Sequence, residues 1–170
     1  GTKIIPSSLS VRELARLNYG KMKELNKKLR RMADFVILDS AAGLGQEAIS
    51  AMEAADELII VTNPEITAGT DALKTIKLAE ELGKPVRGVI VTRVSGNKNE
   101  MAIGNIKGML DVSILGVVPE DKNILAALRN KNALISAYPR SRASVAYKLI
   151  AARIAGVDYK APSFMDRFFG

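Results

Sequence analysis

The sequence predicts an α/β protein with a mostly parallel sheet and helices on both of its faces. Two observations predict this fold. Four apolar runs are continuous rather than alternating, which is typical of strands buried on both faces. Segments with helical spacing of apolar residues separate these runs, and strands joined by helical crossovers must be largely parallel. The sheet is therefore expected to form the middle of three layers.

The first third of the chain predicts two strands and two helices. A short strand, "TKIIP", ends at Pro6. Ser10 is the predicted N-cap of a helix in which apolar residues recur as far as Met32, and lysines and arginines occupy its other, solvent-facing sides. The run "DFVILD" (34–39) is then a buried strand, and "GQEAISAMEAAD" (45–56) is a helix.

The rest of the chain continues the alternation. Predicted strands cover 57–62, 86–92 and 113–118, and predicted helices cover 67–83, 97–111, 123–130 and 141–156. Gly83 and Gly156 follow the last periodic residues of their helices, as expected of C-terminal caps. Gly104 and Gly108 weaken the helix over 97–111, because glycine has a low helix propensity.

Composition removes several classes of chemistry. The 170 residues include no cysteine and no histidine. Disulfides, thiolate or histidine catalysis, iron–sulfur clusters and the usual zinc sites are therefore excluded within these residues. A metal would need oxygen ligands, which suits Mg²⁺. The net charge of +7 favours anionic partners or a solvated basic surface. No apolar run approaches the length of a spanning helix, and the first residues do not read as a signal peptide.

Polar residues stand at the carboxyl end of each predicted core strand. These ends are Asp39-Ser40, Thr62-Asn63, Thr92-Arg93 and Pro119-Glu120. In parallel sheets, ligands bind beyond the carboxyl ends of the strands. Four such ends in register predict a site for a polar ligand along one rim of the sheet.

Asp39 follows four apolar residues, which is the pattern of a Walker B strand. Its carboxylate would hold Mg²⁺ near the terminal phosphates of a nucleotide. Gly43 and Gly45 would let the backbone turn sharply and present amide groups to a phosphate or a catalytic water. The alternative is that the two glycines only form a tight connection from strand to helix.

Four segments in order resemble the MinD branch of the MinD/ParA family of deviant P-loop ATPases. They are "DFVILDSAAGLGQEAI", "ADELIIVTNPEITAGTDALKTI", "GVIVTRV" and "ILGVVPEDKNILAALRNKNALI". The resemblance implies a P-loop NTPase-like fold that binds ATP or ADP with Mg²⁺, Asp39 being the metal and catalytic carboxylate. It also implies that Ser40 and Gly43 lie in a switch that senses the γ-phosphate. It assigns the other cofactor contacts to Asn63, Pro64, Thr92, Arg93, Pro119, Glu120 and Asp121. Arg93 could stack its guanidinium plane on the base.

The phosphate-binding loop of that family is absent from these residues. No G-x-x-x-x-G-K-[ST] motif occurs in the 170 residues. We expect the chain alone to be inactive as an ATPase for this reason. Three explanations are open: the C-terminal part of a longer ATPase, which we favour, one half of a split protein, or a relative that kept the fold and lost hydrolysis. The missing strands would leave an apolar sheet edge exposed.

The end of the chain predicts an amphipathic tail. We divide the chain into a partial MinD-like ATPase domain (1–157) and a linker with the tail (158–170). On a helix, Phe164, Met165, Phe168 and Phe169 share one face. The functional interpretation is an anchor that inserts into a lipid surface, as the family resemblance also implies. The alternative is a tail docked on the body of the protein or on a partner.

The resemblance implies a cytoplasmic ATPase switch, peripheral on the inner face of the cell membrane. ATP would drive homodimerisation and membrane binding, hydrolysis would release the protein, and a regulatory protein would stimulate it. The role would be spatial positioning, above all of the site of cell division. One alternative is a membrane-surface scaffold without hydrolysis. Another is a ParA-like DNA-segregation ATPase, for which DNA would be the partner; the aromatic tail argues against it.

Overall fold

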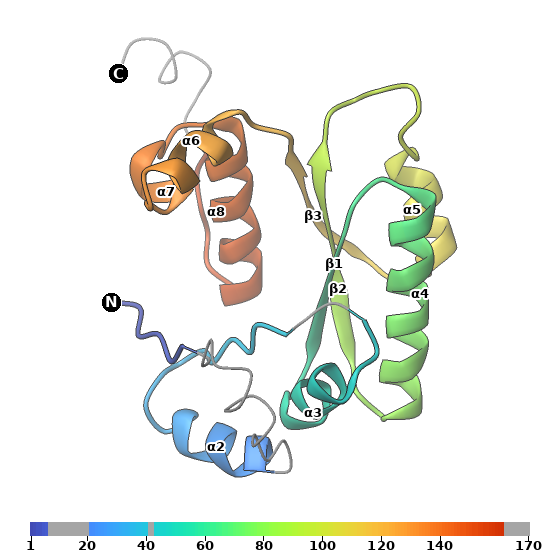
Figure 1. Ribbon diagram of the computed structural model, residues 1–170, viewed down its shortest axis with the longest axis vertical. Coiled ribbons are helices and arrows are strands. Elements are labelled where there is room, and N and C mark those ends of the chain that lie inside the picture. Colours follow the sequence, from blue (N-terminus) through green and yellow to red (C-terminus); the bar gives the residue numbers. More distant parts are fainter. Residues whose placement is uncertain (7–20, 41–42, 162–170) are drawn as a thin grey trace. The chain divides into compact units, whose positions relative to one another are not determined.

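The computed structural model describes residues 1–6, 21–40 and 43–161. The chain forms two compact units, residues 1–56 (unit 1) and residues 57–170 (unit 2). Figure 1 labels their helices and strands.

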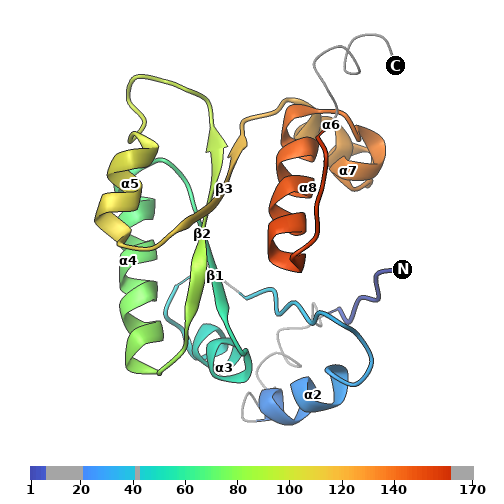
Figure 2. The same cartoon turned by 180° about the vertical axis from the view of Figure 1, so that it is seen from behind.

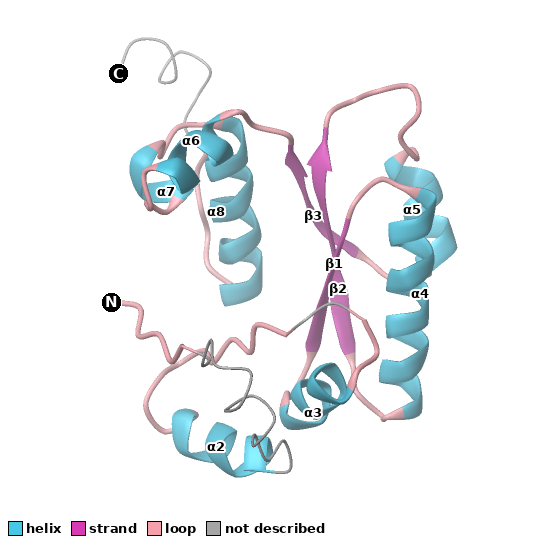
Figure 3. Cartoon of the chain, in the orientation of Figure 1, coloured by secondary structure: helices cyan, strands magenta, loops and turns pink. Residues whose placement is uncertain are grey.

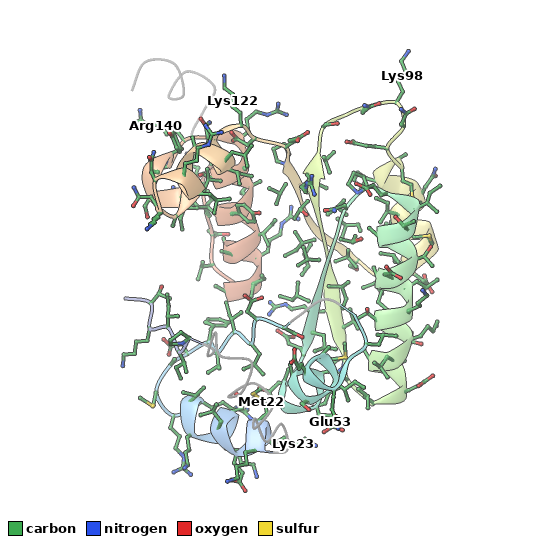
Figure 4. All side chains as sticks on the ribbon, viewed as in Figure 1. Met22, Lys23, Glu53, Lys98, Lys122 and Arg140 are labelled. Carbon is green, nitrogen blue, oxygen red and sulfur yellow. The ribbon has the colours of Figure 1, made fainter. Side chains whose placement is uncertain are left out.

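In the described residues of unit 1 (1–6, 21–40 and 43–56), the helices are α2 (Met22–Leu29) and α3 (Gln46–Ala54). Asn26 of α2 is buried, and its side-chain amide donates a hydrogen bond of 2.6 Å to the carbonyl oxygen of Ala54. Figure 4 labels Lys23 and Glu53, which form an exposed ion pair of 3.2 Å between the two helices. Exposed ion pairs contribute little to stability, so the buried hydrogen bond of the Asn26 side chain is the stronger link between α2 and α3.

Unit 2 is built on a sheet of three parallel strands. They are β1 (Leu58–Thr62), β2 (Val86–Val94) and β3 (Ile114–Pro119), in the order β1-β2-β3. Figure 3 shows them in magenta. Helices α4 (Ile66–Glu81) and α5 (Ile103–Leu110) connect them in turn. The predicted α/β fold with a parallel sheet is therefore confirmed.

Helices cover both faces of this sheet, as Figures 1 and 2 show. α4 and α5 pack on one face around Ile76, Val89, Val91, Ile106 and Leu110, each 2% exposed or less. The other face meets α8 (Arg142–Ala155), with α6 (Asn123–Arg129) and α7 (Leu134–Ala137) beside it. A Cβ atom on Gly116 of β3 would clash with Cγ1 of Ile150, so glycine allows α8 to approach the strand.

The predicted helix ends at Gly83 and Gly156 are confirmed. Gly83 has a φ of +65°, and the amide of Lys84 donates to the carbonyl oxygen of Ala79 across the end of α4. Gly156 has a φ of +68° and follows α8 in the left-handed conformation. Two details differ from the sequence analysis: α5 begins at Ile103 rather than near residue 97, and the single turn α7 was not predicted.

The predicted strands "TKIIP" and "DFVILD" are wrong for this structure. Residues 1–6 and 35–40 form neither helix nor strand. Phe35 is 57% exposed and Ile37 is 89% exposed, so the second run is not buried on both faces. A strand requires hydrogen-bonded neighbours, and no described residue pairs with these two segments in a sheet.

Apolar surface is also left open on the sheet of unit 2. β1 is an edge strand, and Val61 in it is 61% exposed. Within the described ranges, no helix has both the length and the apolar character needed to cross a membrane.

Candidate functional site

The candidate site of unit 2 is its strand-end rim, which we define as residues 62–64, 92–95 and 119–121. These residues follow or end β1, β2 and β3. Because the strands are parallel, their carboxyl ends lie at one edge of the sheet. Three of the four predicted polar strand ends therefore converge. The fourth, Asp39-Ser40, belongs to unit 1.

Hydrogen bonds join the ends of β1 and β2. Thr92 Oγ1 lies 3.0 Å from Asn63 Oδ1 and 3.2 Å from the carbonyl oxygen of Thr62. The Thr92 hydroxyl has one proton, which it donates to one of these acceptors at a time. When Thr92 donates to Asn63 Oδ1, this hydrogen bond orients the side-chain amide of Asn63. The rim thus has an ordered polar centre between two strands.

A β-bulge places Arg93 in an unusual backbone conformation. In the pairing of β2 with β3, Val91 is opposite Val117 and Val94 is opposite Pro119, so two residues of β2 face one residue of β3. Arg93 has a φ of +58° and is exposed. This left-handed conformation costs a non-glycine residue about 1–2 kcal/mol. Such strain is concentrated at functional sites, and bulges there re-aim side chains.

Backbone hydrogen bonds tie the segments of the rim to one another. The amide of Glu120 donates to the carbonyl oxygen of Val94 at 2.9 Å, which joins the residues after β3 to the end of β2. The amide of Met101 donates to the carbonyl oxygen of Pro64, also at 2.9 Å, which joins the β2–α5 loop to the residues after β1. Pro64 is itself buried. The rim is therefore held at both its sides.

The Glu100 side chain closes the loop that follows Arg93. Its carboxylate accepts hydrogen bonds from the hydroxyl and amide of Ser95 and from the amide of Gly96, at 2.5–3.2 Å. The hydroxyl of Ser95, followed by these amides, lowers the pKa of the Glu100 carboxyl below its ordinary value. Sequence analysis missed this residue. The available signal was an acidic residue closing a Ser-Gly-Asn turn.

Asp121, one of the predicted cofactor-binding residues, has its carboxylate engaged by two helices. Its Oδ1 accepts from the amide of Asn123 at 2.9 Å, and its Oδ2 accepts from the amide of Ala143 at 3.2 Å. Partial burial acts to raise the pKa of Asp121, but these hydrogen bonds outweigh it and lower the pKa. The side chain therefore fixes α6 and α8 together at the end of β3.

The predicted residues of unit 1 lie on a short irregular segment. Asp39 and Ser40 end residues 35–40, which form neither helix nor strand. Gly43 has a φ of +98°, a conformation that favours glycine and fits the predicted sharp turn before α3. In the described part of the chain, no three acidic side chains gather as a metal site would require. The assignment of Mg²⁺ to Asp39 remains a prediction, and one carboxylate alone makes an incomplete site.

The residues predicted to form the anchor, Phe164, Met165, Phe168 and Phe169, lie outside the described residues. The phosphate-binding loop is absent from the sequence itself. At the strand ends, the structure provides a wall made of backbone groups, the side-chain amide of Asn63 and the guanidinium of Arg93. That wall suits a planar, polar, aromatic group such as a nucleotide base.

The parallel sheet, the helices on both faces and the polar rim define the α/β class that includes the P-loop NTPases. A family model described as "ParA: NUBPL iron-transfer P-loop NTPase" matches residues 19–155. The chain belongs to the MinD/ParA family of P-loop NTPases. The description of that model mentions iron transfer, but these 170 residues contain no cysteine to bind an iron–sulfur cluster.

Similar proteins include both relatives of unknown role and MinD proteins. An uncharacterized ATP-binding protein of Methanocaldococcus jannaschii is 36% identical over 99% of this chain and 66% of its own length. The septum site-determining protein MinD of Bacillus subtilis is 37% identical over 80% of this chain and 52% of its own. The Pyrococcus horikoshii MinD structure, solved with Mg-ADP, matches with a TM-score of 0.81 and 28% identity. The match covers 86% of this chain and 60% of the Pyrococcus chain. The chain thus spans about half to two thirds of these proteins.

Proposed function

We propose that the strand-end rim forms the base-side wall of an adenine-nucleotide site, within a MinD-like ATPase switch. The observation that carries the proposal is the convergence of three strand ends on Arg93, held in a strained conformation by a bulge. The name of the Methanocaldococcus relative and the Mg-ADP bound to the Pyrococcus protein support an adenine nucleotide.

Two kinds of contact would recognise the base. The Arg93 guanidinium would stack on the face of the ring, an interaction worth about 1–2 kcal/mol when partly shielded from water. Backbone groups of 119–121 and the amide of Asn63, oriented by Thr92, would meet the polar edge of the ring. The Asp121 side chain is already engaged, so this residue would contribute through its backbone.

The phosphates require groups that this sequence does not include. Without a P-loop, no lysine and no cradle of amides would neutralise the β- and γ-phosphates. Residues beyond these 170, in the same or another chain, would supply them. Asp39 would then approach Mg²⁺, with Ser40 and Gly43 as part of the switch. When bound, Mg²⁺ would neutralise charge on the phosphates.

The cellular role that we propose is spatial positioning, with cell division as its most specific form. The names of MinD relatives at 30–37% identity support this role. ATP would favour the homodimer, and each protomer would place one tail on the membrane. Two tails bind with far higher avidity than one, which would couple nucleotide state to membrane residence. A regulatory protein would stimulate hydrolysis.

A matched pair of variants tests the base-side wall. Arg93→Ala removes the stacking cation, and Lys98→Ala removes a cation from the same loop outside the rim. We expect Arg93→Ala to weaken binding of a fluorescent ATP analogue about tenfold in anisotropy titrations, and Lys98→Ala to change it less than twofold. Equal effects of the two variants, or equal competition by unlabelled guanine and adenine nucleotides, would contradict the proposal.

The proposed anchor has its own test. Deleting Phe164–Gly170 should abolish flotation of the protein with vesicles while leaving nucleotide binding unchanged. Identical flotation with and without these residues would show that the tail is not the anchor. The nucleotide proposal would survive that result, because it rests on residues of the rim.

A further inference from the structure

The surface of α6 and α7 combines exposed apolar side chains with cations. Leu125 and Leu128 of α6 are 66% and 65% exposed, and Ile135 of α7 is 47% exposed. They do not face the core, because Ala127 and Ile124 occupy the inner side of α6. Leu125 and Leu128 are three residues apart in one helix, so they are neighbours on its outer side.

Five cations lie between the N-cap of α6 and the start of α8. Lys122 and Arg129 lie three residues before and four residues after Leu125, and Lys131 follows α6. Arg140 lies between α7 and α8, and Arg142 is the first residue of α8. Figure 4 shows Lys122 and Arg140 at the same end of unit 2. Within the described ranges, none of these five cations forms an ion pair. We name this set, with the two leucines and Ile135, the basic–apolar surface.

The charge of this part of the chain is one-sided. No acidic residue occurs from Lys122 to Val157, although that stretch includes seven lysines and arginines. Asp121 directly precedes this stretch, and its carboxylate accepts hydrogen bonds from the amides of Asn123 and Ala143. The surface therefore presents uncompensated positive charge around exposed leucines.

We propose that the basic–apolar surface is a lipid-contacting face that binds membranes containing acidic headgroups. An acidic bilayer offers both complements at once: phosphates for the cations and acyl chains for the leucines. Long lysine and arginine side chains can reach phosphates while their stems lie along apolar surface. This inference extends the membrane association proposed above, but it rests on other residues than the tail.

Other partners fit this surface less well. A nucleic acid would engage the cations and leave both leucines in water. A second copy of the same surface would bring like charges together.

Unique labelling is possible because the sequence has no cysteine. Leu128→Cys, carrying an environment-sensitive fluorophore, reports on the proposed face, and Lys74→Cys on α4 is the control. With phosphatidylglycerol vesicles, we expect a blue shift at position 128 and none at 74. With phosphatidylcholine vesicles, position 128 should not respond. Vesicle binding without a shift at 128, no binding at all, or an equal shift at 74 would overturn the proposal.

Charge reversal tests the cations. Lys122→Glu with Arg129→Glu should lower the partition coefficient on phosphatidylglycerol vesicles at least about twentyfold in co-sedimentation, at roughly fivefold per cation removed. The control pair Lys74→Glu with Lys77→Glu has the same change in net charge on α4 and should have a much smaller effect. Equal losses for both pairs would mean that only net charge matters, and would overturn the proposal.

The apolar part separates lipid from nucleic acid. Leu125→Ser with Leu128→Ser should weaken vesicle binding by roughly tenfold or more, since each leucine loses its burial in lipid, and should leave binding to a DNA duplex unchanged. Vesicle binding unaffected by this pair would overturn the lipid assignment. The same samples, titrated with the fluorescent ATP analogue, should bind nucleotide as the wild type does, so a failure here is distinct from a failure of the nucleotide proposal.

Discussion

Removing the Asp121 carboxylate should destabilise unit 2, because it joins two helices at the end of β3. Asp121→Ala leaves the amides of Asn123 and Ala143, now 2.9 Å and 3.2 Å from this acceptor, without their partner. Loss of an acceptor at a helix N-terminus typically costs about 1 kcal/mol. Two such losses predict about 2 kcal/mol. Asp121→Asn keeps one oxygen acceptor and should cost about 1 kcal/mol.

The pH dependence of this effect has a definite sign. The pKa of Asp121 is lowered in the folded state. A carboxyl group with a lowered folded pKa stabilises the protein above its unfolded pKa of about 3.9, and this contribution is lost as the pH falls through the folded value. The difference between wild type and Asp121→Asn should be constant from about pH 5 to pH 8 and should shrink below about pH 4.

Urea unfolding followed by circular dichroism at several pH values measures these differences. Asp71→Asn is the control, because Asp71 is an exposed residue on α4 in a surface pair with Lys74, and its loss should cost less than about 0.5 kcal/mol. The reasoning would be refuted if Asp121→Asn were as stable as the wild type at pH 7. It would also be refuted if the difference grew as the pH fell.

Three further changes have specific expected outcomes. Gly116→Ala should lower the free energy of unfolding by about 1–3 kcal/mol, because the added Cβ would clash with Ile150. The double variant with Ile150→Ala should lose less stability than the sum of the two single variants. Additive losses in thermal unfolding would contradict this contact. Glu100→Gln should shift the amide NMR signal of Ser95 and speed proteolysis of the β2–α5 loop, whereas an unchanged spectrum would argue against the loop closure. Asn26→Ala should lower the free energy of unfolding by about 1–2 kcal/mol and speed hydrogen exchange of the backbone amides in α2. Unaltered exchange would mean that the buried hydrogen bond of Asn26 contributes little.

Local patterns predicted most of unit 2. The runs that became β1, β2 and β3 are continuous and apolar, and Gly83 and Gly156 end their helices as expected. The rim was predictable too, because Thr62-Asn63, Thr92-Arg93 and Pro119-Glu120 are polar groups placed where apolar runs stop. Such features depend on neighbours close in sequence or on one repeated periodicity, which a single sequence displays.

Features that depend on distant partners were not predictable. Residues 34–39 have the same apolar pattern as the three real strands, yet a strand exists only where another strand accepts and donates its hydrogen bonds. The bulge at Arg93 arises from the register between β2 and β3, and nothing local encodes a positive φ for arginine. The engagement of Asp121 by Ala143 joins residues 22 positions apart. That contact appears only when α8 packs on the sheet.

The most direct measurement of the central claim is an NMR titration of the ¹⁵N-labelled chain with adenosine. Adenosine has no phosphates, so it probes the base-side wall without the P-loop, and we expect weak binding with Kd on the order of 1 mM. Amide shifts should be concentrated at residues 62, 63, 92–95, 120 and 121, since Pro64 and Pro119 have no amide proton. The shifts should be smaller with guanosine and with the Arg93→Ala variant. Shifts confined to other parts of unit 2, or none at saturating adenosine, would contradict the claim that these strand ends recognise an adenine base.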